Sequence, residues 1–159
     1  MDFSIVSGPF GGVTEGPAWD GELLLFTHID SSRIFAYDPI SRVTSVHREN
    51  TNFCNGTMFN NEGRYFGCEG GARRVVEYTG KSIRVISDNF NGLAYNIPND
   101  LAVDTQGSIW FTDPFYEGSG GDWSKDRTQM ELDHESVYKI PNNKDSFSDS
   151  IRVTFDTTR

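Results

Sequence analysis

Short apolar runs alternate with glycine-containing turns along this chain, and one arrangement occurs three times. Each copy opens on a polar residue, continues as an apolar run, turns, and returns as a second apolar run. The lead residues Glu15, Asn55 and Asn99 are 40 and 44 positions apart (55 − 15 and 99 − 55). The turns of the three copies contain Gly21, Gly63 and Gly107. This pattern predicts pairs of short strands joined by tight turns.

A second spacing repeats in the same way. The apolar segments Arg33–Tyr37 and Arg74–Tyr78 begin 18 and 19 residues after Glu15 and Asn55 (33 − 15 and 74 − 55). A period in the forties that is built from short strands is typical of a β-propeller, with one four-stranded blade per repeat. We therefore predict an all-β chain. Its blades are expected at about 15–50, 55–90 and 99–156.

The length of the chain limits the number of blades. A chain of 159 residues holds fewer than four repeats of this size, whereas propellers have about four to eight blades. We expect about three and a half four-stranded blades, an incomplete ring that forms the N-terminal half of a larger propeller. Residues 3–6 have the pattern of a strand, and we expect its partner in the missing half.

The third repeat carries an insertion. About 22 residues rich in glycine, aspartate and serine, 115–136, separate its second strand from its third. Loops of this length inside a compact domain are usually functional or disordered. The insertion starts at the outer end of a strand, so we expect it to reach over the mouth of the channel. Its charged part, 122–135, is expected to be solvated.

Composition excludes several classes of function. The net charge is −9, with 23 acidic and 14 basic residues, and Arg73-Arg74 is the one adjacent basic pair. Nucleic-acid binding needs clustered basic residues and is not expected. The chain opens on no charged and apolar leader, and no apolar run approaches membrane-spanning length, so we expect a cytoplasmic protein. The cysteines Cys54 and Cys68 are expected as buried thiols, and a disulfide between them stays open.

The three lead residues are the strongest candidates for chemistry. Because the inner strands of a propeller converge on one channel, Glu15, Asn55 and Asn99 are expected to face a single site. Their carboxylate and amide oxygens suit Ca²⁺ or Mg²⁺, and Mn²⁺ less well. Such an ion polarises a carbonyl or phosphoryl oxygen. The alternative is that these side chains cap strand ends by bonding nearby backbone.

The histidines and Asp113 are weaker candidates. His28, His47 and His134 share no repeat phase and have no metal-ligand spacing. We expect His28 within a strand and the other two in solvent. Asp113 precedes Pro114 at a strand end, where a turn cap and a site role are both open.

Five segments in this order carry a family resemblance. They are Glu15–Trp19, Asn55–Thr57, Cys68–Val75, Asn96–Asp100 and Gly107–Tyr116. Over about residues 8–155 the chain resembles the SMP-30/gluconolactonase family of six-bladed propellers. The resemblance implies a lactone hydrolase with one divalent ion in its channel. We expect Ca²⁺ first, with Zn²⁺, Mg²⁺ or Mn²⁺ as alternatives.

The resemblance also implies roles for individual residues. Glu15 stands where the family has a metal ligand. Asn99 stands where the family contacts substrate and where its phosphatase branch binds the metal, and Asp100 is the neighbouring site residue. Glu117 falls where the sugar-lactone branch has a substrate-contacting acid. Ile97 stands where that branch has an arginine two residues before the key asparagine. The resemblance therefore does not imply that this chain recognises a sugar lactone through an arginine.

Part of the family's site has no counterpart here. A further asparagine ligand and the aspartate that acts as general base belong to later blades, beyond Arg159. We therefore expect a metal-dependent hydrolase of a small lactone or ester that is inactive as this chain alone and needs the C-terminal half of its propeller. No membrane or nucleic-acid partner is expected. The alternatives are a non-enzymatic propeller that binds a ligand or protein, and assembly of two such halves into a ring.

Overall fold

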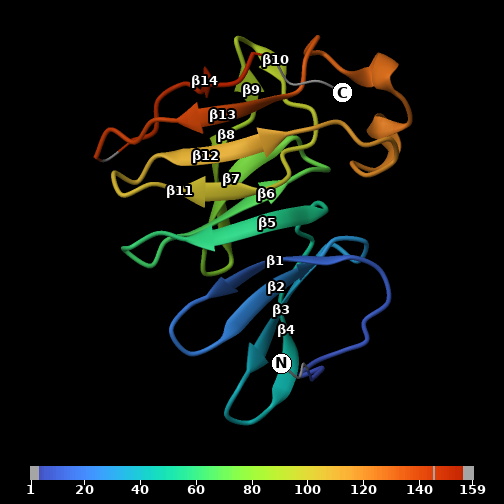
Figure 1. Cartoon of the computed structure of the whole chain (residues 1–159), viewed down its shortest axis with the longest axis vertical. Helices are drawn as coiled ribbons and strands as arrows, with labels where there is room; N and C mark the ends of the chain where they lie inside the picture. Colours follow the sequence, from blue (N-terminus) through green and yellow to red (C-terminus); the bar gives the residue numbers. More distant parts are fainter. Residues whose placement is uncertain (1–3, 145, 156–159) are drawn as a thin grey trace.

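Three four-stranded antiparallel sheets follow one another along the chain (Figure 1). The computed structural model describes residues 4–144 and 146–155. The first sheet comprises β1 (Thr14–Trp19), β2 (Leu24–His28), β3 (Arg33–Asp38) and β4 (Val43–Glu49). The second comprises β5 (Cys54–Phe59), β6 (Tyr65–Glu69), β7 (Arg74–Thr79) and β8 (Ser82–Ser87). The third comprises β11 (Leu101–Val103), β12 (Ile109–Asp113), β13 (Ser136–Ile140) and β14 (Ile151–Arg152).

Each sheet is a simple meander, with its strands hydrogen-bonded in chain order. This is the arrangement of a propeller blade, so the predicted all-β class and the three repeats are confirmed. Figure 1 shows β5 between β1 and β11, the first strands of the neighbouring blades. The amide of Gly56 in β5 donates to the carbonyl of Asn99, 2.7 Å away. The Thr57 hydroxyl donates to the carbonyl of Gly16 in β1 at 2.6 Å.

Several boundaries differ from the prediction. β11 begins at Leu101, two residues after Asn99, and β14 covers only two residues. Residues 4–6 form no strand, and Phe3 lies outside the described residues. Between the second and third blades lies a small hairpin of β9 (Asn89–Phe90) and β10 (Leu93–Ala94). Its Asn91-Gly92 turn has φ values of 54° and 83°, the left-handed pair that such two-residue hairpins require. The Asn-Gly dipeptide is a sequence signal for this hairpin.

The second blade supplies the core on both of its faces. Val75 belongs to a buried cluster shared with the third blade, and its neighbour Val76 to one shared with the first, because successive residues of a strand point to opposite faces. Cys68 and Cys54 are likewise buried in these two different clusters, and both are free thiols. The expectation of buried thiols is thus confirmed, and the open alternative of a disulfide is not realised.

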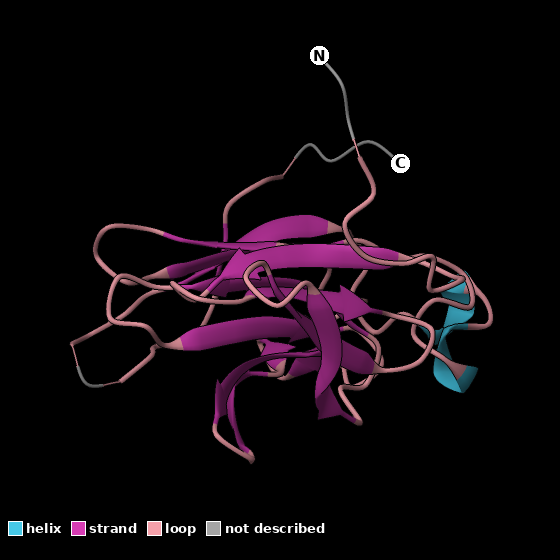
Figure 2. Cartoon of the chain, turned by 90° about the horizontal axis from the view of Figure 1, so that it is seen from below, coloured by secondary structure: helices cyan, strands magenta, loops and turns pink. Residues whose placement is uncertain are grey.

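Two short 3₁₀ helices complete the described elements, η1 (Asp122–Ser124) and η2 (Arg127–Gln129). Figure 2 shows both at one end of the sheets, within the insertion of the third repeat. Among the described residues, no helix is long and apolar enough to cross a membrane.

Glycine follows the lead residue in the first two blades and lets the inner strands approach. Gly16 has a φ of +49°, and a Cβ there would lie 2.4 Å from the carbonyl oxygen of Asn55. A Cβ at Gly56 would lie 2.6 Å from the Cα of Asp100. Both distances fall below van der Waals contact with backbone atoms, so larger residues would force neighbouring blades apart.

Gly16→Ala should therefore destabilise the fold much more than a glycine substitution of similar φ in open space. We expect the free energy of unfolding to fall by about 3 kcal/mol, because backbone strain and a clash add together. Gly80→Ala is the matched control: its φ is +55° and no atom lies within 4 Å of its added Cβ. It should cost about 1 kcal/mol. Urea unfolding measures both, and equal losses would contradict the proposed close approach.

Candidate functional site

The three lead residues line one cavity of about 390 Å³. Glu15 lies in β1, Asn55 in β5, and Asn99 just before β11. The inner strands of the three blades lie side by side (Figure 1). Because each lead residue sits at the same phase of its blade, this packing brings residues 40 and 44 positions apart to one cavity. The structure thus unites the three residues that the sequence singled out.

A second, apolar set lines the same cavity, and sequence reasoning missed it as a set. Val13, Phe53 and Ile97 each stand two positions before a lead residue (15 − 13, 55 − 53 and 99 − 97). The signal was available, because the offset is identical in all three repeats. Ile29 and Asp30, which follow β2, complete the wall on the side of the first blade.

The donor atoms around the cavity suit a hard cation. Glu15 offers a carboxylate, and Asn55 and Asn99 offer amide oxygens, the ligand types that Ca²⁺ and Mg²⁺ prefer. Asp30 adds a carboxylate whose Oδ2 accepts a hydrogen bond of 3.2 Å from the Val13 amide. In residues 4–144 and 146–155, no group of three or more His, Cys, Asp or Glu side chains is clustered as a metal site. The side-chain oxygens of Glu15, Asn55 and Asn99 fit such an ion in chemical type.

The other two predicted site residues lie apart from this cavity. Asp100 is exposed, its Oδ1 accepts a hydrogen bond from the Leu101 amide at 2.8 Å, and it borders a neighbouring cavity of about 480 Å³. Asn99 and Tyr116 line both cavities and therefore lie at the border between them. Glu117 is exposed between Tyr116 and Gly118, which line the first cavity, while Glu117 is not among its lining residues.

The insertion is more ordered than the sequence suggested. Tyr116, Gly118 and Ser119 form one wall of the cavity, in keeping with the expected reach over the channel. Its charged part is not simply solvated, because Ser124 and Leu132 are buried. Arg127 also forms an ion pair with Glu135 across the insertion.

Arg73 of the second blade holds this insertion. Its Nη1 pairs with the Oε1 of Glu131 at 3.0 Å, and its Nη2 donates to the carbonyl of Ala94 at 3.2 Å. Its guanidinium lies 4.3 Å from the ring centroid of Trp123. Glu131 in turn accepts a hydrogen bond from the Ala94 amide at 2.9 Å. Arg73 thus connects η1, the β9–β10 hairpin and the end of the insertion.

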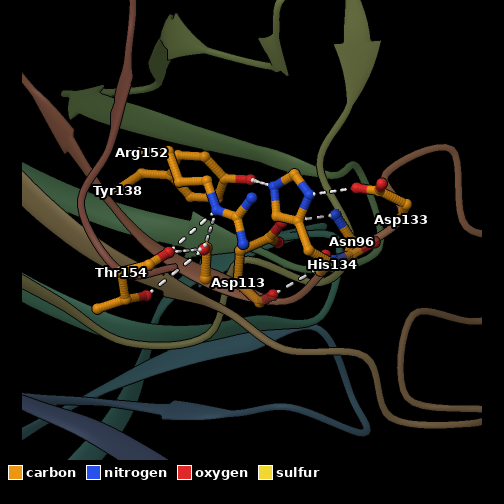
Figure 3. A network of polar contacts seen from close by, with 8 residues as sticks. Asn96, Asp113, Asp133, His134, Tyr138, Arg152 and Thr154 are labelled. Carbon is orange, nitrogen blue, oxygen red and sulfur yellow. Dashed lines mark hydrogen bonds and ion pairs between the residues drawn. The ribbon is translucent and has the colours of Figure 1, made fainter. Parts of the chain in front are cut away.

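A buried polar network supports the segment that carries Ile97 and Asn99 (Figure 3). Asp113 is fully buried, and its Oδ2 accepts a hydrogen bond from the Asn96 amide at 2.9 Å. The side-chain amide of Asn96 donates to the carbonyls of Asp113 at 3.3 Å and His134 at 2.9 Å. Burial raises the pKa of Asp113 to about 8. Asp113 thus bonds to a residue 17 positions earlier in the chain, and it also lines the cavity of about 480 Å³ beside Asp100.

His134 is not in solvent, contrary to expectation. Its Nε2 lies 2.7 Å from the Tyr138 hydroxyl, and its Nδ1 lies 2.6 Å from the Oδ1 of Asp133 (Figure 3). The network across the insertion and β13 therefore positions the ring, which no repeat phase signals. His28 lies in β2 as expected, and His47 is exposed as expected.

The buried carboxyl predicts a pH dependence of stability. Folded Asp113 keeps its proton to about pH 8, whereas an unfolded aspartate releases it near pH 4. Between these values the folded state binds more protons, so the free energy of unfolding falls as pH rises, by at most about 1.4 kcal/mol per pH unit. Asp113→Asn should flatten this slope between pH 5 and 8 in urea unfolding. Asp122→Asn, at a fully exposed carboxylate, is the control, and equal slopes in both variants would contradict the assignment.

Removal of the Arg73 side chain should loosen the insertion while the blades stay folded. Arg73→Ala deletes one ion pair, one stacking contact and two hydrogen bonds to the carbonyls of Ala94 and Tyr95, contacts worth about 0.5–3 kcal/mol each. We expect amide hydrogen exchange in 118–131 to become about tenfold faster or more. Arg33→Ala, which removes an exposed ion pair with Glu49, is the matched control. Unchanged exchange in Arg73→Ala would show that other contacts hold the segment.

Comparison with known proteins agrees with this geometry. The SMP-30/Gluconolactonase/LRE-like region matches residues 13–156. A gluconolactonase of Zymomonas mobilis is 27% identical over 143 residues, which cover 80% of this chain and 39% of the relative. A protein named strictosidine synthase-like 3, from Arabidopsis thaliana, is 27% identical over 89 residues, 55% of this chain and 23% of the relative.

A solved structure shares the fold. It is a gluconolactonase of Xanthomonas campestris, 30% identical, with a TM-score of 0.77 over 89% of this chain and 47% of the other. The chain therefore spans about half of that solved chain and 39% of the Zymomonas mobilis relative, in keeping with the partial propeller of about three and a half blades that the length predicts. On the family match over residues 13–156, this chain belongs to the SMP-30/gluconolactonase/LRE-like family.

Proposed function

We propose that the protein is a divalent-metal-dependent hydrolase of lactones, to which these residues contribute one side of the active site. One observation carries the proposal: three oxygen-bearing side chains from three successive blades, Glu15, Asn55 and Asn99, line a single cavity. The gluconolactonases named above are similar over most of the chain. A small ester or lactone fits a cavity of about 390 Å³.

Glu15 is the proposed metal ligand of this half, with Ca²⁺ as the preferred ion. A bound divalent ion would polarise the lactone carbonyl. Asn99 presents its side chain from a backbone that is fixed on both sides: its amide donates to the carbonyl of Thr112 at 2.9 Å, and its carbonyl accepts from Gly56 at 2.7 Å. Such a fixed position lowers the cost of orienting a substrate. Asp100 and Glu117 are proposed as further substrate contacts.

The same reasoning predicts no turnover by the 159-residue chain alone. The resemblance puts the remaining ligands and the general base outside these residues, and water activation needs such a base. Glu15 is exposed here, so it stays hydrated until a surrounding ring encloses it, and hydration weakens its attraction for an ion. The proposal therefore concerns the protein that contains this chain together with the rest of its ring.

The test is lactone hydrolysis by the product of the longest reading frame that includes this chain. With Ca²⁺ present we expect turnover of a δ-lactone, and chelation should abolish it. Glu15→Gln, which keeps the shape and removes the charge, should lower kcat/KM by about 100-fold or more. Glu22→Gln, in the exposed turn between β1 and β2, is the matched control and should leave kcat/KM unchanged.

Two results would contradict the proposal. Hydrolysis that survives both chelation and Glu15→Gln would exclude a metal held by Glu15. A longer chain that binds Ca²⁺ or lactone but turns none over would favour the non-enzymatic propeller instead.

A further inference from the structure

The cavity is lined in two chemically distinct layers. Glu15, Asn55 and Asn99 form a polar layer at one repeat phase. The apolar layer, two positions earlier in each blade, consists of Val13, Phe53 and Ile97. In all three blades the lining side chain is polar at the lead position and apolar two positions earlier. The two layers are therefore a property of the whole cavity and not of one loop.

The three residues of the apolar layer are buried to different degrees. Ile97 is 4% exposed, and the Cβ that Gly70 lacks would lie 2.7 Å from its Cγ2, so the glycine leaves room for this methyl group. Val13 is 50% exposed, and Phe53 is half-buried. Ile29 continues the apolar surface beside Val13. A ligand that reaches past the polar layer therefore meets hydrocarbon on the sides of all three blades.

The charge of the cavity limits its ligand further. Among the described lining residues, Glu15 and Asp30 are acidic and none is lysine or arginine. An anionic substituent would meet the Asp30 carboxylate and no lysine or arginine among the described lining residues, so only the ion proposed at Glu15 would offset its charge. A hydroxyl-rich substituent would leave its hydroxyl groups unpaired against the apolar layer, which costs binding free energy.

We infer that the apolar layer binds a hydrocarbon arm of the substrate, so that the protein selects uncharged lactones or esters with an alkyl substituent. The inference rests on the proposed function, because the reacting carbonyl must lie at the polar layer. Val13, Phe53 and Ile97 are then the residues that determine specificity. Each methylene that becomes fully buried strengthens binding about fourfold.

The test uses the product of the longest reading frame that includes this chain, in the presence of Ca²⁺, and NMR follows both the affinity for each probe and any hydrolysis of it. The probes are δ-decalactone, which carries a five-carbon arm, δ-valerolactone, which is the bare ring, and a δ-lactone whose arm ends in a carboxylate. We expect δ-decalactone to bind about tenfold more tightly than δ-valerolactone or better. The carboxylate probe should bind about as weakly as the bare ring or more weakly.

Polar variants then locate the effect. The double variant Val13→Thr with Ile97→Thr makes both side chains polar and shortens residue 97 by one methyl group, so the preference for the arm should fall to about twofold or less. Val13→Thr alone, at a half-exposed position, should reduce that preference partway without endangering the fold. Val43→Thr, at an exposed valine of β4, is the matched control and should keep the wild-type ratio.

The outcomes separate this inference from the proposed function. If δ-valerolactone binds but the arm adds nothing, the inference fails and the proposed function stands. If the preference for the arm persists in the double variant, the arm binds elsewhere and the inference is also overturned. If neither lactone binds, both are wrong. Loss of preference in the double variant, with wild-type affinity for δ-valerolactone retained, supports the inference.

Discussion

Direct contact between the backbones of neighbouring inner strands is the constraint on which this structure depends. The amide of Gly56 donates across the blade boundary to the carbonyl of Asn99 at 2.7 Å, and no Cβ fits at Gly16 or Gly56. Because the strands meet without side chains between them, the residues just before these glycines lie next to each other. The same contact that closes the blade boundary therefore assembles the polar layer of the cavity.

The close boundaries and the shared core explain why the site is built across blades. The middle blade buries one face against each neighbour, as Val75 and Val76 illustrate, so the relative position of three blades is fixed by packing on both sides. The polar network around Asp113 adds a local constraint, because the amides of Asn96 and Ile97 are both bonded to the end of β12 and the residue after it. Site residues from different blades are thereby held by the fold itself.

The sequence predicted what repeats and failed where the chain departs from the repeat. Strand positions and the convergence of Glu15 and Asn99 follow from a spacing that propeller geometry converts into proximity. The insertion has no counterpart in the other blades, so nothing signalled that Arg73 would meet Glu131, 58 positions away. His134 belongs to the same non-repeating segment, and its burial was missed for the same reason. Long-range contacts between single residues carry no periodic signal.

The polar and apolar layers of the cavity differ in how readily their residues can be substituted, and this difference bears on how proteins of one fold bind different ligands. Hydrogen bonds of the main chain hold the three residues of the apolar layer. The carbonyl of Val13 accepts from the Ile29 amide at 3.1 Å, and the amide of Ile97 donates to the carbonyl of Pro114 at 3.0 Å. The amide of Phe53 donates to a serine hydroxyl at 3.0 Å. These hydrogen bonds hold the main chain at the three positions whichever side chain each position carries. All three precede the inner strands and take no part in the sheet hydrogen bonds. Under the inferred role of this layer, substitution at the exposed Val13 would change which ligand fits while these backbone hydrogen bonds remain, and function in such a fold then follows the side chains grafted onto it.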